Sequence, residues 1–153
     1  MTVVGIIPAR YGSTRLPGKP LKLIAGKPMI EHVYRRAEKA ACLAELLVAT
    51  DDLRIKEAVE AFGGKALMTS VDHQTGTDRL VEAVGHLDLG PEDIIINIQG
   101  DEPLLEPRML DELAQPLLDD PGLVMATLKH RITDAVEVND PNVVKVVTDF
   151  NGF

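Results

Sequence analysis

The sequence has 153 residues, enough for one domain with a sizeable core, and its 45% hydrophobic and 26% charged residues are typical of a globular protein. The formal net charge of −8 argues against nucleic acids and membranes as general partners, since both are anionic. No apolar run approaches the ~20 residues that span a bilayer, and one cysteine cannot form an internal disulfide, so we expect a cytoplasmic protein.

Short apolar runs rich in β-branched residues predict buried strands. These runs cover residues 3–7, 46–50, 65–68, 94–98 and 124–128. Apolar residues at three- and four-residue steps predict helices over 28–41, 52–62 and 77–87, and a fourth from Met109 that Pro116 interrupts. This alternation favours a three-layer α/β/α fold with a mostly parallel, Rossmann-like central sheet.

The end of the sequence predicts a strand that lacks a partner. Residues 142–149 have a strand pattern, and Asn151 and Gly152 form a typical two-residue hairpin turn. Only Phe153 follows, so the returning strand is not in the sequence. We therefore expect residues 1–153 to form a single domain that is incomplete at its C-terminus, with a frayed tail as the alternative.

The first thirty residues are basic and contain no acidic side chain. Their cations are Arg10, Arg15, Lys19, Lys22 and Lys27. The segment is rich in glycine and follows the first predicted strand, a common arrangement for holding phosphates. It is not a P-loop, because five residues separate Gly12 from Gly18 and Pro20 stands where that motif has Ser or Thr.

Four side chains of this basic segment suit phosphate binding. Arg10 and Arg15 can clamp phosphates with planar guanidinium groups, and Lys19 supplies a point charge. Ser13 offers a backbone N–H and a hydroxyl. The alternative is a solvated basic loop, and Lys22 and Lys27 in particular fit surface positions.

A carboxylate follows the predicted strand over residues 94–98. Asp101 comes three residues after this strand, where it could hold Mg²⁺, a hard cation that prefers oxygen ligands. The alternative is a turn or N-cap residue. We expect Glu102 to be a first-turn acid of the next helix.

Two further loops are expected at the same edge of the sheet, because ligands of such folds bind beyond the carboxyl ends of the strands. Thr50 and Asp51 end the second strand, and Gly76 and Arg79 lie at the start of the third helix. The alternative for the helix start is Thr77 as N-cap with Arg79 in solvent.

Taken in order, these segments resemble the sugar nucleotidyltransferases, and among them the 3-deoxy-manno-octulosonate (KDO) cytidylyltransferases. The matching segments are residues 7–20, 48–51, 72–80, 97–103 and 142–147. The resemblance implies a Mg²⁺-dependent reaction of CTP with KDO that gives CMP-KDO and diphosphate for lipopolysaccharide synthesis. It also implies a homodimer for the full-length protein.

The resemblance assigns roles to individual residues. Arg10, Lys19 and Asp101 would be catalytic, and Asp101 would bind the metal. The nucleotide would contact Ala9, Arg10, Ser13, Arg15, Lys19, Thr50, Asp51, Gly76, Arg79 and Gln99.

Members of the family are longer than this chain. Their additional part supplies a second metal-binding aspartate, much of the KDO pocket and most of the dimer surface. We therefore expect the 153 residues alone to be weakly active or inactive. Two alternatives stay open: a non-catalytic nucleotide-binding remnant, and a cytidylyltransferase for another acid sugar.

Overall fold

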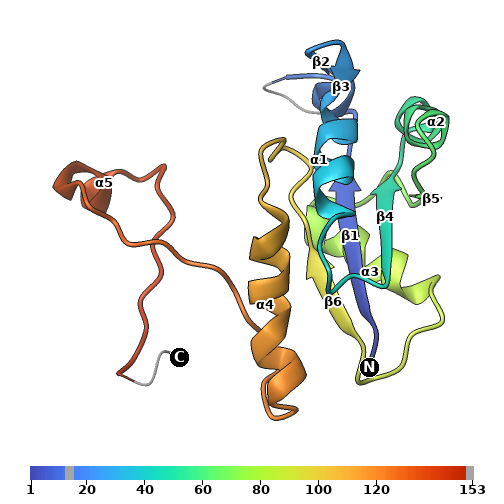
Figure 1. Ribbon diagram of the computed structural model, residues 1–153. Coiled ribbons are helices and arrows are strands. Elements are labelled where there is room, and N and C mark those ends of the chain that lie inside the picture. The colour runs from blue at the N-terminus through green and yellow to red at the C-terminus, as the bar shows by residue number, and fades with distance from the viewer. Residues whose placement is uncertain (13–15, 151–153) are drawn as a thin grey trace.

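A computed structural model of the chain describes residues 1–12 and 16–150. Its centre is a parallel sheet with the strand order β5-β4-β1-β6 (Figure 1). The strands are β1 (Val3–Ala9), β4 (Glu45–Thr50), β5 (Ala66–Met68) and β6 (Ile94–Asn97). The strands predicted at these four places, and their parallel arrangement, are confirmed.

Helices cover both faces of the sheet. One face packs against α1 (Met29–Ala37), α2 (Leu53–Ala61) and α4 (Pro107–Asp119), and the other against α3 (Gly76–Gly85). Because side chains alternate along β1, Ile7 joins the first core cluster while Ile6 joins Ala83 of α3 in the second. The predicted three-layer α/β/α architecture is confirmed.

The helix starts differ in part from the expected ones. Thr75, and not Thr77, is the N-cap of α3, and it forms a capping box with Asp78. Helix α4 begins at Pro107, so Glu102 lies ahead of the helix and is not in its first turn. The same helix continues through Pro116 to Asp119, three residues beyond the predicted interruption.

A small hairpin connects the basic segment to α1. The 3-10 helix η1 (Lys19–Leu21) is followed by the antiparallel strands β2 (Leu23–Ile24) and β3 (Lys27–Pro28). The ring Nε2 of His32 in α1 lies 2.7 Å from the carbonyl oxygen of Ile24. This contact ties the hairpin to the helix that follows it.

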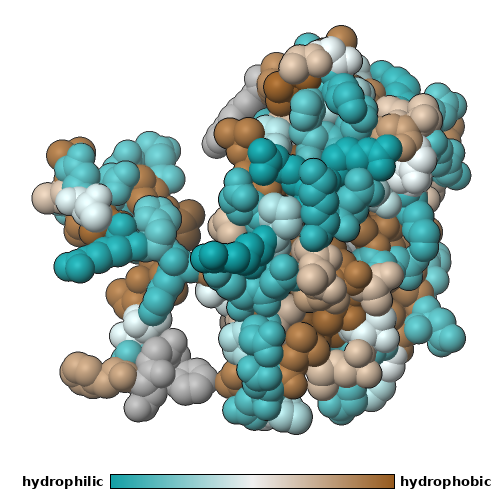
Figure 2. Space-filling view, in the orientation of Figure 1, coloured by the Kyte–Doolittle hydropathy of each residue, from teal (hydrophilic) through white to brown (hydrophobic). Residues whose placement is uncertain are grey.

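Residues 129–150 extend away from the sheet (Figures 1 and 2). They contain the short helix α5 (Ala135–Asn139), and the strands predicted over 124–128 and 142–149 are wrong. A strand needs a neighbouring strand that pairs with its backbone groups. Residues 123–128 run along α4 and β6 but do not pair with the sheet. Val124 and Val144 are more than 90% exposed. The turn predicted at Asn151 and Gly152 lies outside the described residues. Within the described ranges, no helix is long and apolar enough to cross a bilayer.

The carboxyl ends of the strands meet at one edge of the sheet. Ala9 pairs with Thr50, which in turn pairs with Met68, and Ile6 pairs with Asn97 at the end of β6. The loops that follow these strands therefore lie together, as expected for a parallel sheet.

Candidate functional site

An open pocket of about 800 Å³ lies at the carboxyl edge of the sheet. Its walls come from the end of β1, the basic segment, the start of α3 and the loop after β6. The pocket brings together seven of the residues predicted from the sequence: Ala9, Arg10, Lys19, Gly76, Arg79, Gln99 and Asp101. Two others, Ser13 and Arg15, lie outside the described residues.

A second hollow, of about 940 Å³, lies between β6, α4 and residues 121–128. Its walls are largely apolar, with Ile96, Leu110 and Val124 among them, and its described lining includes no Lys or Arg. An anionic ligand would find no Lys or Arg side chain among the described residues of this groove. The smaller pocket is therefore the candidate site for a phosphorylated ligand.

Lys19 and Asp101 form an ion pair at the pocket, with Lys19 Nζ 2.6 Å from Asp101 Oδ2. Their side chains are 39% and 51% exposed, so both groups remain accessible to a ligand. The exposed Arg10 lines the same pocket directly after β1. The pocket thus carries two accessible cations and one carboxylate, besides the buried Arg79.

Two glycines place the two ends of this ion pair. Gly18 has a φ of +66°, and an added Cβ would lie 2.9 Å from the Tyr11 ring. A side chain there would therefore disturb the backbone turn that leads into Lys19. An added Cβ on Gly100 would lie 3.1 Å from the carbonyl oxygen of Pro8. This close approach of the loop after β6 to β1 puts Asp101 beside the pocket.

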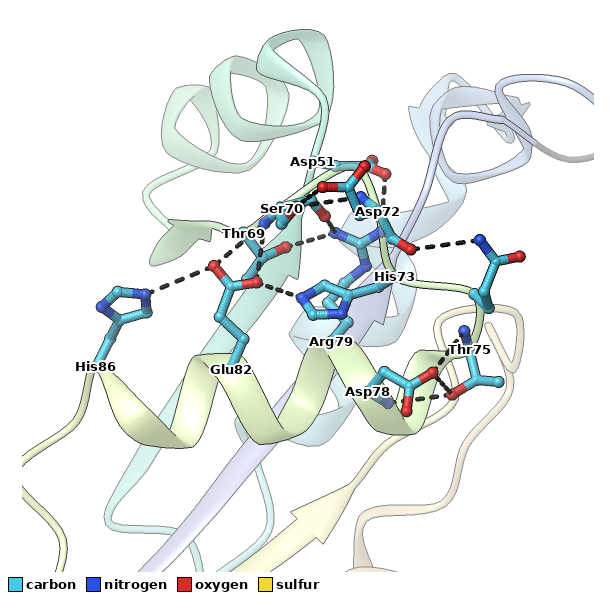
Figure 3. Close-up of polar contacts among 11 residues, drawn as sticks. Asp51, Thr69, Ser70, Asp72, His73, Thr75, Asp78, Arg79, Glu82 and His86 are labelled. Carbon is cyan, nitrogen blue, oxygen red and sulfur yellow. Dashed lines mark hydrogen bonds and ion pairs between the residues drawn. The ribbon is translucent and has the colours of Figure 1, made fainter.

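Arg79 is buried, and its guanidinium group binds protein atoms (Figure 3). Nη2 forms a 2.7 Å ion pair with Asp51, while Nη1 donates to the Ser70 carbonyl at 3.2 Å and to the Thr69 hydroxyl. The alternative that places Arg79 in solvent is wrong. Arg79 lines the pocket, but it also fixes the segment between β5 and α3.

Thr50 and Asp51 do not line the pocket. The hydroxyl of the fully buried Thr50 accepts a 3.2 Å hydrogen bond from the backbone N–H of Asp52, at the start of α2. Asp51 is engaged by Arg79. Both side chains are thus held by protein partners, and the nucleotide contacts expected for these two residues stay predictions.

Several pocket residues were missing from the sequence-based set. They are His73, Gln74, Thr75, Thr77 and Asn97. Asn97 could have been found, because it is the polar member of an otherwise apolar run. The others lie between the end of β5 and the first turn of α3, and tertiary contacts bring them to the pocket.

Glu82 on α3 is a further residue that motif analysis missed. Its carboxylate accepts hydrogen bonds from His73 and from the backbone N–H of Ser70, and these contacts hold the pKa of Glu82 below its usual value. Glu82 follows Arg79 by three positions, an i, i+3 spacing that places both on one side of the helix. That spacing was the only signal in the sequence.

Asp101 could hold a divalent cation. Mg²⁺ usually binds one or two carboxylates and completes its shell with water and substrate phosphates. The described residues include no group of three or more His, Cys, Asp or Glu placed to hold a metal ion by themselves. A single accessible carboxylate beside two cations fits a Mg²⁺ ion that arrives with a phosphorylated substrate.

Comparison with known proteins gives a consistent result. The cytidylyltransferase family model matches residues 4–152. A relative from Trichlorobacter lovleyi, named 3-deoxy-manno-octulosonate cytidylyltransferase, is 54% identical over 153 residues, which are all of this chain and 60% of the relative. A relative of the same name from Geobacter sulfurreducens is 55% identical over the same shares. The chain thus spans about 60% of the length of these relatives.

Solved structures agree. The structure of a CMP:2-keto-3-deoxy-manno-octonic acid synthetase complexed with CTP has a TM-score of 0.77 and 58% identity, and the match covers 80% of this chain and 50% of that one. A cytidylyltransferase from Leptospira borgpetersenii has a TM-score of 0.68 and 26% identity, with 80% and 51% covered. The architecture, the cationic pocket and the family match lead to one conclusion: the chain belongs to the cytidylyltransferase family.

Proposed function

We propose that the chain is the nucleotide-binding part of an enzyme that joins CTP and KDO to form CMP-KDO and diphosphate. The observation that carries the proposal is the meeting of Arg10, Lys19 and Asp101 at one pocket of an α/β sheet. The names of the relatives and the CTP bound to a similar structure support the choice of substrates.

The reaction forms a bond between the anomeric oxygen of KDO and the α-phosphorus of CTP. The bond from the α-phosphorus to the bridging oxygen breaks, diphosphate leaves, and the hydroxyl proton passes to solvent. Lys19 and Arg10 would donate hydrogen bonds to phosphate oxygens and stabilise the charge that develops on them. The chain thus contributes position and electrostatics, the main needs of such a transfer.

The supporting residues act on the same pocket. Gln99 and Gly76 would contact the nucleotide, and Ala9 would pack against it at the end of β1. Ser13 and Arg15 remain proposed phosphate ligands. Asp101 would hold Mg²⁺, which when bound neutralises part of the phosphate charge.

We further propose that the sugar pocket and the homodimer surface use residues that the relatives carry beyond the matched 60%. The chain alone would then bind CTP and turn it over slowly. A cytoplasmic location and the lack of nucleic-acid and membrane partners stay predictions from composition.

A chimera tests the function. The 153 residues are joined to the remaining part of the Trichlorobacter lovleyi relative, and diphosphate release is followed with CTP, KDO and Mg²⁺. We expect KDO-dependent release from the chimera, little from the 153 residues alone, and a large loss in the chimera with Lys19→Ala. A folded chimera without activity, or near-normal turnover by the 153 residues alone, would contradict the account.

The same assay with other sugars tests the acceptor. The 8-amino analogue of KDO and sialic acid replace KDO in parallel reactions. We expect the highest kcat/KM with KDO, and preference for another sugar would overturn the proposed acceptor while leaving the nucleotide assignment in place.

A further inference from the structure

Helix α3 holds the backbone of Ser70 with two side chains of opposite charge (Figure 3). Arg79 Nη1 donates to the Ser70 carbonyl at 3.2 Å. The Glu82 carboxylate accepts the Ser70 N–H, at 2.9 Å to Oε2 and 3.2 Å to Oε1. Both backbone polar groups of Ser70 are therefore bound to the same helix.

Glu82 also holds a side chain of the pocket wall. Its Oε2 contacts Nε2 of His73, a residue that lines the pocket, and its Oε1 lies 3.6 Å from Nε2 of His86. The side chains of His73 and Glu82 are only 20% and 28% exposed. The contact is thus partly shielded from solvent. Charge-assisted hydrogen bonds are stronger in such a shielded place than in water.

The segment between β5 and α3 has anchors at both ends. The Thr69 N–H donates to the Thr50 carbonyl at 2.8 Å, and the capping box joins Thr75 to Asp78. Glu82 binds the part between these anchors, from which His73 and the exposed Gln74 face the pocket. Loss of that contact would leave this part of the wall to be ordered by the ligand itself.

We propose that Glu82 is a positioning residue of the nucleotide site, which fixes Ser70 and His73 so that residues 73–77 form a ready-made wall. The proposal rests on the proposed function, because it assigns the nucleotide to this pocket. Glu82 does not line the pocket, so it acts through His73 and the backbone. A preorganised wall binds more tightly, since the cost of ordering it is not paid on binding.

The test compares Glu82→Ala and Glu82→Gln with Glu57→Ala, a control at an exposed glutamate within α2. The rate of amide hydrogen exchange at Ser70 shows whether its contact with Glu82 persists, and titration with CTP gives the affinity of the site. We expect Glu82→Ala to speed exchange at Ser70 and to raise the Kd for CTP, each by about tenfold. Glu82→Gln keeps one acceptor oxygen and should give intermediate values, while Glu57→Ala should match the wild type.

Exchange at Ile6 in the centre of β1 serves as the measure of global folding. Slow exchange there in every variant shows that any change at Ser70 is local. Unchanged exchange at Ser70 in Glu82→Ala would overturn the contact, and faster exchange with unchanged CTP affinity would overturn the positioning role. A wild-type chain that binds no CTP would remove the proposed function and with it the nucleotide role of Glu82. The ratio of the Ser70 exchange rates in Glu82→Ala and in the wild type separates that failure from loss of the contact.

Discussion

Lys19 and Asp101 lie 82 residues apart in the sequence, yet Lys19 Nζ is 2.6 Å from Asp101 Oδ2. An ion pair this exposed contributes little to the stability of the fold. Its importance lies in what it brings together, because a cation suited to phosphate and a carboxylate suited to Mg²⁺ share one pocket. The pair arises because the loops after β1 and β6, neighbouring strands of a parallel sheet, meet at the same edge.

Replacement of Lys19 should weaken nucleotide binding. Lys19→Ala removes a charged donor to the phosphates and should raise the Kd for CTP by about 10- to 100-fold in calorimetric titration. Lys19→Arg keeps the charge and should recover part of the affinity. Lys22→Ala, at an exposed lysine of the same basic segment, is the control and should bind as the wild type does. Equal affinities for Lys19→Ala and Lys22→Ala would contradict the assignment.

Replacement of Asp101 should have effects of opposite sign with and without Mg²⁺. Asp101→Asn removes the proposed metal ligand, so CTP affinity in the presence of Mg²⁺ should fall. With EDTA present, the same change frees the charge of Lys19 and should leave CTP affinity equal or higher. Asp88→Asn, at an exposed aspartate, should change neither value. A loss of affinity of the same size in both conditions would show that Asp101 does not act through the metal.

The buried Arg79 should stabilise the fold through Asp51. Arg79→Met leaves Asp51 without its partner and should lower the free energy of unfolding by about 3 kcal/mol, measured with urea. The double change Asp51→Asn and Arg79→Met should recover part of this loss, because the unpaired charge is gone. Arg108→Met, at a side chain that is 85% exposed, is the control. A loss no larger than that of the control would contradict a structural role for the pair.

Asp93 should make stability depend on acidic pH. Hydrogen bonds from the backbone N–H groups of Gly90, at 2.8 Å, and Thr2, at 2.6 Å, hold the pKa of Asp93 below its usual 3.8. The unfolded chain therefore binds this proton more readily, so the contribution is present above pH 3.8 and is lost as pH falls through the lower, native pKa. Asp93→Asn should lower stability at pH 7 and have a smaller effect near pH 3. An equal effect at both pH values would contradict this.

The central fold could be predicted because its signals are local. Apolar runs mark β1, β4 and β6, and periodic apolar residues mark α1 to α4. Residues 124–128 carry the same kind of signal but form no strand, since pairing depends on a neighbour that a local pattern does not supply. Likewise, the cap of α3 shifted from Thr77 to Thr75 because the reciprocal bonds with Asp78 favour the earlier residue.

The site could be predicted where charged side chains come directly after a strand in the sequence. Lys19 and Asp101 could be chosen because a basic glycine-rich loop and a carboxylate each follow an apolar strand. The structural role of Arg79 could not be predicted, because its burial and its bond to Asp51 depend on tertiary contacts between residues 28 positions apart. Glu82 and His73 were missed for the same reason.

The most direct test of the account is to map where CTP binds on the chain. In amide NMR spectra of the 153 residues titrated with CTP and Mg²⁺, we predict saturable shifts at Arg10, Lys19, Gly76 and Gln99. Leu110 and Val124, which line the apolar groove beside α4, should not shift. Shifts confined to that groove, or no saturable change at all, would contradict the assignment of the nucleotide to the pocket of Lys19 and Asp101.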